Sequence, residues 1–369
     1  MELSPEDTLR LKVLLANQPQ AIRIDESTMT LHGLSSRGEV QVRLRPNCRE
    51  EQYIKAVKEM LSGHVLGSPG GYPVYLQRWT RLGQMRDGNL EQLLLLGEPE
   101  AVVAVACAPG LSDELARRAW WAMEDAGNAR RMLARPAIVG GDMGPVLARY
   151  LVEHLPFESE PEQQMDTVAL VLQTGLIDMA AKLELWKKAG RRNAYYVGFL
   201  EASPDDLPLE GISSPLLEKL SGLVGEDDRD PLVALYRRVL SSAGQAFLET
   251  VERVFRKPSN QEVVSRTLDV VARYFSAARP DGVTDLSLDE IEAESVRWIE
   301  GLEGPAASLM ADTPDVRQQL CSLRVLSGVG YGVVRPALRD STAIGSLMRR
   351  KLEPVLGPLL THVRGLRPA

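Results

Sequence analysis

The chain has 369 residues, of which 44% are hydrophobic and 25% are charged, as is usual for a globular protein. Its formal net charge of −7 excludes the strongly basic footprint of many nucleic-acid-binding proteins, so we do not expect nucleic acid as the partner. The longest apolar run, residues 101–108, is far shorter than the ~20 residues of a membrane-spanning helix, so we expect no membrane span.

The N-terminal residues lack the charged and apolar regions of a signal peptide. The three cysteines, Cys48, Cys107 and Cys321, are too widely spaced for a disulfide framework. We therefore expect a soluble protein in the reducing cytoplasm. Charge is uneven along the chain, because residues 335–369 contain seven Arg or Lys and two acids. RNA binding by this basic segment is a weaker alternative.

Two patterns in chain order predict a small α+β segment at the N-terminus. Ser4-Pro5-Glu6 has the residue types of a helix start and predicts a helix to about Ala16. Residues 21–25 and 39–45 alternate apolar and polar side chains, which predicts two half-buried strands. Gly33 and Ser35-Ser36 lie between them and suit the connection of a β-hairpin.

From about Arg49 onward the apolar residues recur with helical periodicity. Helix starts are predicted at three Ser-x-x-Glu patterns, which fit capping boxes, and at two X-Pro pairs. These starts are Ser159, Ser259, Ser287, Asp230-Pro231 and Thr313-Pro314.

The expected fold is mostly α: an irregular array or bundle of helical hairpins with a small N-terminal β-hairpin. We assign residues 1–65 to a small α+β segment, 66–204 to a helical domain and 205–369 to a second helical domain. Turn residues between 203 and 215 suggest the second boundary, which is soft and leaves the two helical parts open to being continuous.

Cys48 is the best single candidate for chemistry. It follows a predicted strand and precedes a predicted helix, with Arg45 and Arg49 close in sequence. A helix N-terminus and nearby cations both favour the thiolate form. The alternative is a surface cysteine without a role, since lone cysteines are rarely catalytic.

No pattern predicts a metal or a cofactor. The four histidines, His32, His64, His154 and His362, show no paired ligand spacing. The glycine-rich residues 67–73 lack the Gly-Lys-Ser/Thr ending of a phosphate loop, and residues 328–332 follow a helix and not a strand. We interpret both as turns.

Two cations and two aromatic residues lie close together in the sequence: Arg191, Arg192, Tyr195 and Tyr196. This combination of side chains could bind an anion, a nucleic-acid base or a protein partner. The alternative is a structural helix start with amphipathic tyrosines and arginines that extend to solvent. We take these four residues as the partner-binding candidate.

Four segments have a distinctive sequence: residues 67–79 (GSPGGYPVYLQRW), 93–102 (LLLLGEPEAV), 117–123 (RRAWWAM) and 195–200 (YYVGFL). Together they resemble the DsrS family. Its members are soluble accessory proteins found with the reverse-acting dissimilatory sulfite reductase system of sulfur-oxidising bacteria. The resemblance implies a cytoplasmic role in sulfur oxidation, and it carries over no catalytic residue.

Two hypotheses of function follow. The first is a non-catalytic scaffold that binds a protein partner of the sulfur-oxidation machinery. The second is a sulfur-handling or redox protein that uses Cys48 as a persulfide carrier.

Overall fold

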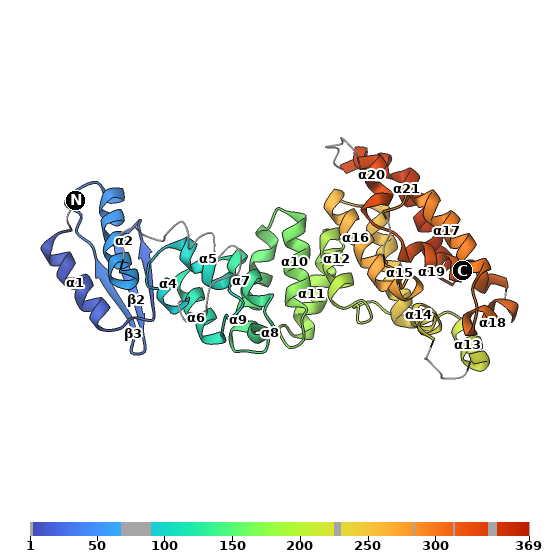
Figure 1. Cartoon of the computed structure of the whole chain (residues 1–369), viewed down its shortest axis with the longest axis horizontal. Coiled ribbons are helices and arrows are strands. Elements are labelled where there is room, and N and C mark those ends of the chain that lie inside the picture. The colour runs from blue at the N-terminus through green and yellow to red at the C-terminus, as the bar shows by residue number, and fades with distance from the viewer. Residues whose placement is uncertain are drawn as a thin grey trace. The chain divides into compact units, whose positions relative to one another are not determined.

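A computed structural model describes residues 3–67, 90–224, 230–282, 285–312, 314–338 and 345–368 (Figure 1). Within these residues the chain is mostly helical with one small antiparallel sheet near the N-terminus, which confirms the predicted fold class. The chain divides into two compact units. Unit 1 comprises Met1–Pro156 with Thr174–Leu176, and unit 2 comprises Phe157–Gln173 with Ile177–Ala369. The boundaries expected near residues 65 and 205 stay predictions, and both lie inside these units.

Unit 1 starts as a helix, a sheet and a second helix, and continues as a series of shorter helices. Its elements are α1 (Pro5–Ala16), β1 (Ala21–Asp25), β2 (Thr30–Ser35), β3 (Gly38–Arg43), α2 (Glu50–Leu66), α4 (Leu90–Leu93), α5 (Pro99–Cys107), α6 (Asp113–Ala122), α7 (Ala126–Leu133), α8 (Pro136–Val139) and α9 (Met143–His154). A short 3-10 turn, Leu155–Phe157, follows α9.

The sheet has three strands where the sequence predicts two. β1 and β3 correspond to the predicted strands, and the segment expected to connect them forms β2, paired antiparallel to both. Gly33 lies within β2, opposite Ile22 and Val40. A Cβ atom at this position would lie 3.2 Å from Leu14 Cδ1. The glycine therefore permits close packing of α1 on the sheet and does not form the turn.

The apolar side chains of the alternating strands contribute to the N-terminal core. Apolar side chains of α1, α2 and the strands pack into one cluster, in which Leu11, Leu31, Val57 and Leu61 are completely buried. Burial of this face against two helices explains why residues 21–25 and 39–45 alternate.

Unit 2 consists of helices. They are α10 (Pro161–Val171), α11 (Met179–Ala189), α12 (Asn193–Ala202), α13 (Leu216–Val224), α14 (Pro231–Leu240), α15 (Ser242–Arg256), α16 (Gln261–Tyr274), the 3-10 turn η3 (Ser276–Ala278), α17 (Leu288–Glu300), α18 (Pro305–Asp312), α19 (Pro314–Ser327), α20 (Tyr331–Leu338) and α21 (Gly345–Gly365). α12 packs against α10, α11, α15 and α16 (Figure 1).

The predicted helix starts have mixed outcomes. Ser287 forms the expected capping box with Glu290, and the Asp230 carboxylate accepts hydrogen bonds from two backbone N–H groups of α14. The predictions at Ser159 and Ser259 are wrong by one residue, because Glu160 and Asn260 are the N-caps of α10 and α16. Thr313 lies outside the described residues.

In the part of the chain that the structure describes, no helix is both long and apolar enough to cross a membrane.

Candidate partner-binding surface

The four residues of the predicted partner-binding cluster separate into two buried and two accessible side chains. Tyr195 and Tyr196 are 1% and 7% exposed and belong to the core face of α12. Tyr196 packs edge-on against Trp186, with ring centroids 4.9 Å apart. Arg191 is exposed and Arg192 is partly exposed. The tyrosines thus contribute packing, and the two arginines are the members that a partner can contact directly.

Arg192 connects the surface to this core. Its Nη1 donates a hydrogen bond to the Tyr195 hydroxyl over 3.3 Å, and its guanidinium carbon lies 5.9 Å from the centre of the Tyr195 ring. Burial raises the pKa of Tyr195, and the nearby Arg192 charge opposes that rise. Arg192 is also the N-cap residue of α12 and gives it no side-chain cap.

The fold brings a second group of cations to the start of α12. The Asn193 side-chain amide donates a hydrogen bond to the Lys257 carbonyl, which holds the end of α15 beside the α11–α12 connection. Lys187, Arg191 and Lys257 are exposed. Among the described residues, none of these three has a carboxylate within ion-pair distance.

Four further arginines, two from α15 and two from the end of α21, pair with two carboxylates of α15. The Glu252 carboxylate is 5% exposed and bonds to Arg256 at 2.6 Å, to Arg364 at 2.8 Å and to Arg367. Glu249 pairs with Arg253 at 2.5 Å and with Arg367 at 3.2 Å. Four arginines therefore share two carboxylates, which leaves this region with net positive charge.

Burial acts to raise the pKa of Glu252, but the hydrogen bond from Arg364 and the charges of Arg256 and Arg367 outweigh it, so that the pKa is lowered. The carboxylate is thus held as an anion, and the surrounding cations do not lose their partner at neutral pH.

We call this surface the basic corner. It consists of Lys187, Lys188, Arg191, Arg192, Arg253, Arg256, Lys257, Arg364 and Arg367. Most of these cations lie in or just beyond the last turn of α11, α15 or α21, where a cation interacts favourably with the helix dipole. Helix stabilisation accounts for cations at each helix end. It does not account for the contacts between the helices: Asn193 bonds to the Lys257 carbonyl at the end of α15, and Arg364 at the end of α21 bonds to Glu252 of α15.

The sequence identifies Arg191 and Arg192 but misses Arg256 and Lys257. The basic residues of α15 are visible in the sequence, but more than sixty positions separate them from Arg191. Only the packing of α12 against α15 makes them neighbours.

Cys48 lies between β3 and α2, as the sequence predicts. Its side chain is half-buried and packs against the N-terminal core. The thiol donates to the Arg49 carbonyl over 3.6 Å. Of the two cations expected to favour a thiolate, Arg45 pairs with Glu6 at 3.3 Å. Arg49 is the N-cap residue of α2, and its side chain makes no cap hydrogen bond there. A role for Cys48 in sulfur transfer stays a prediction.

An open pocket of about 620 Å³ lies in unit 1 beside β1 and the start of α5. Arg23 and His32 line it, and both approach Glu39, at 3.6 Å and 2.6 Å. The Arg23 guanidinium also stacks on the Trp121 ring at 5.0 Å. The lining carries both signs of charge, and Arg23, His32 and Glu26 pair with residues outside it. It therefore does not favour a ligand of one charge.

A serine, a histidine and a glutamate meet where α17, α19 and α21 pack. His362 contacts Ser322 Oγ through Nδ1 at 3.0 Å and Glu292 through Nε2 at 3.2 Å. Ser322 is 3% exposed, and its hydroxyl donates to the Gln318 carbonyl. A nucleophilic serine must reach substrate and give its proton to the histidine. This buried hydroxyl does neither, so the contact is structural.

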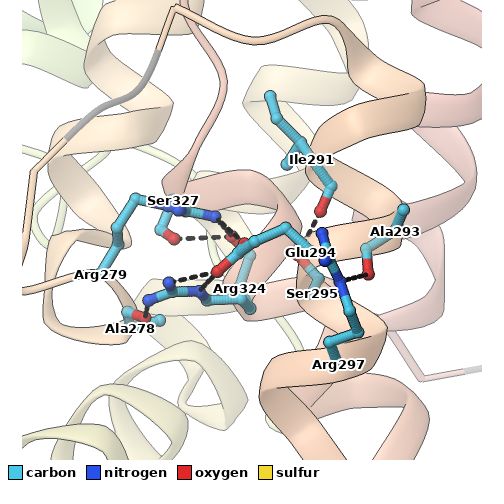
Figure 2. Close-up of polar contacts among 9 residues, drawn as sticks. All are labelled: Ala278, Arg279, Ile291, Ala293, Glu294, Ser295, Arg297, Arg324 and Ser327. Carbon is cyan, nitrogen blue, oxygen red and sulfur yellow. Dashed lines mark hydrogen bonds and ion pairs between the residues drawn. The ribbon is translucent and has the colours of Figure 1, made fainter.

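Figure 2 shows a buried ionic cluster in the same helices. Glu294 of α17 accepts from Arg279 at 2.6 Å and from Arg324 of α19 at 2.5 Å. Arg324 also donates to the Ala278 carbonyl at 2.7 Å and stacks on the Trp298 ring. These bonds tie η3, α17 and α19 together.

Among the described residues, no three His, Cys, Asp or Glu side chains lie close enough to hold a metal ion.

Comparison with known proteins adds no relative: no protein-family model, no curated protein and no solved structure matches the chain. The resemblance to the DsrS family therefore rests on the sequence segments alone, and residues 68–79 of the first segment lie outside the described residues.

Proposed function

We propose that the protein is a non-catalytic scaffold of the cytoplasm that binds a protein partner of the sulfur-oxidation machinery. The observation that carries the binding role is the basic corner, where cations of α11, α15 and α21 are linked through Asn193 and Glu252 on a chain of net charge −7. The sulfur-oxidation assignment is supported by the resemblance to the DsrS family.

A charged surface of this kind guides encounter with a partner of opposite charge. Arginine is also enriched among the residues that dominate binding energy at protein interfaces. Arg191 is exposed, and Arg192 is oriented by its hydrogen bond to the buried Tyr195. An oriented side chain loses less conformational entropy when it binds.

We expect the double substitution Arg191→Ala/Arg192→Ala to reduce partner capture from sulfur-grown cells by at least about fivefold, as for loss of an arginine anchor. The measurement is a pull-down quantified by mass spectrometry. Capture by the wild type should also weaken above physiological ionic strength, where the Debye length falls below ~8 Å.

The matched control is Arg37→Ala/Arg43→Ala, which removes two exposed arginines of unit 1 and should capture the partner normally. Cys48→Ser should also leave capture unchanged. If the Arg191/Arg192 variant captures as much as the wild type, the basic corner is not the binding surface. If the wild type captures nothing and Cys48→Ser abolishes sulfur transfer by the pure protein, the carrier hypothesis replaces the scaffold.

A further inference from the structure

The basic corner has more positive charge than the neighbouring carboxylates neutralise. Glu252 and Glu249 are already shared among four arginines, and Glu184 pairs with Lys188 at 2.8 Å. Lys187, Arg191 and Lys257 are left exposed, without a carboxylate in ion-pair distance among the described residues.

These three cations come from segments that the fold brings together. Lys187 lies in the last turn of α11, which ends at Ala189, and Arg191 follows in the turn after it, where its backbone N–H bonds to the Lys188 carbonyl at 3.0 Å. Lys257 is brought beside them by the hydrogen bond from Asn193 to its carbonyl. The result is a group of long, solvated cations built from two segments of the chain.

From this charge distribution we infer that the basic corner binds an acidic segment of a protein, with closely spaced Asp or Glu side chains. The inference rests on the proposed function and adds the chemistry of the partner. Each carboxylate of such a segment would pair with one of the three cations, and Arg191 can bind a carboxylate through two parallel hydrogen bonds.

An acidic protein segment fits this surface better than a nucleic acid does. Proteins that bind single-stranded nucleic acid stack the bases on exposed aromatic rings. The aromatic rings nearest the corner, Tyr195, Tyr196 and Trp186, are at most 9% exposed and occupied in packing. The chain's net charge of −7 also opposes a long polyphosphate more than a short acidic peptide.

The test uses the full chain and a labelled oligoglutamate peptide, with binding followed by fluorescence anisotropy. We expect Lys187→Gln/Arg191→Gln/Lys257→Gln to weaken binding by about tenfold through the loss of three exposed ion pairs. The control is a second triple variant that removes three exposed cations of unit 1, Lys12→Gln/Arg37→Gln/Lys55→Gln. It should bind oligoglutamate as tightly as the wild type. Circular dichroism checks that each variant is folded.

Lys257→Gln alone provides a second variant, because Lys257 lies just beyond the end of α15 and its side chain is exposed. It should weaken binding by about twofold. Carbodiimide coupling, which joins a carboxylate to a contacting amine, should link oligoglutamate to Lys187 or Lys257 in preference to Lys12 or Lys55.

The inference is overturned if the two triple variants bind oligoglutamate equally, or if coupling does not favour Lys187 and Lys257. It is also overturned if oligouridine binds more tightly than oligoglutamate and depends on the same three residues, which would establish an RNA site. If the pull-down depends on Arg191 and Arg192 but oligoglutamate does not bind, the scaffold function stands and only the acidic chemistry of the partner is wrong.

Discussion

Replacing Glu294 by glutamine is expected to lower the free energy of unfolding by about 2–3 kcal/mol. The side chains of Arg279 and Arg324 are 3% and 7% exposed, so the substitution leaves two buried guanidinium groups without a counter-charge. Removing one partner of a fully buried pair costs ~3–5 kcal/mol. The effect should be smaller here because 26% of the Glu294 side chain is exposed. Urea unfolding at neutral pH measures it.

The matched control is Glu300→Gln, at the end of the same helix. Glu300 is 62% exposed and lies 4.0 Å from Arg317, so its loss should cost less than about 0.5 kcal/mol. Equal losses for the two variants would show that the cluster in Figure 2 contributes no more than a surface ion pair.

The Glu294 effect should depend on pH in a defined direction. Burial acts to raise the pKa of Glu294, but hydrogen bonds from Arg324 and Arg279 outweigh it and lower the pKa. A carboxylate with a lowered pKa in the folded state contributes its full stability above the unfolded pKa, ~4.3 for Glu, and loses it as pH falls through the folded pKa. The stability difference between wild type and Glu294→Gln should therefore narrow below about pH 4.

Gly198→Ala is expected to destabilise unit 2 by about 2 kcal/mol, because overpacking costs ~1–3 kcal/mol and exceeds the gain in helix propensity. Gly198 lies where α12 crosses α10. An added Cβ would lie 2.6 Å from Val168 Cβ and 2.9 Å from the Met165 carbonyl oxygen. Neither atom is the mobile end of a side chain, so the two helices must move apart.

Gly190→Ala is the control for this substitution. Its Cβ would lie 3.5 Å from the Lys187 carbonyl oxygen, an ordinary contact distance. Its stability should stay within about 0.5 kcal/mol of wild type. Thermal unfolding followed by circular dichroism compares the two, and a Gly198→Ala protein as stable as Gly190→Ala would contradict the close approach of α10 and α12.

Sequence periodicity was sufficient for the fold class but not for the details of pairing. The alternation in residues 21–25 and 39–45 marks β1 and β3, because Ile22, Ile24 and Val42 pack in the N-terminal core. Val40 belongs to the same alternation but is 47% exposed. β2 was not predicted, although Leu31 and Leu34 are buried, because its glycine resembles a turn signal. Two adjacent polar residues, Ser259 and Asn260, could each serve as the N-cap of α16, and the backbone conformation selects Asn260.

The candidate site was predictable only in part, for a similar reason. Arg191 and Arg192 stand out as consecutive cations, but the sequence does not show that α12 turns Tyr195 and Tyr196 into the core. Helical stripes reveal that a face is buried when the opposite face is polar. The face of α12 opposite Tyr195 is also buried, from Ala194 through Leu200, so no stripe is visible. Lys257 joins the site through a tertiary contact that leaves no local pattern.

The assembly of the basic corner from three helices has a thermodynamic consequence. Arg256 and Arg364 share Glu252 only while α15 and α21 are docked, and Lys257 lies beside the α11–α12 connection only while α15 is docked there. A partner that engages cations of all three helices binds the folded form of unit 2 and has little affinity for the unfolded chain. Its concentration then enters the folding equilibrium by mass action, and at one hundred times its dissociation constant it adds about 2.7 kcal/mol to the stability of the unit. The corner makes the stability of the folded unit responsive to how much partner is present.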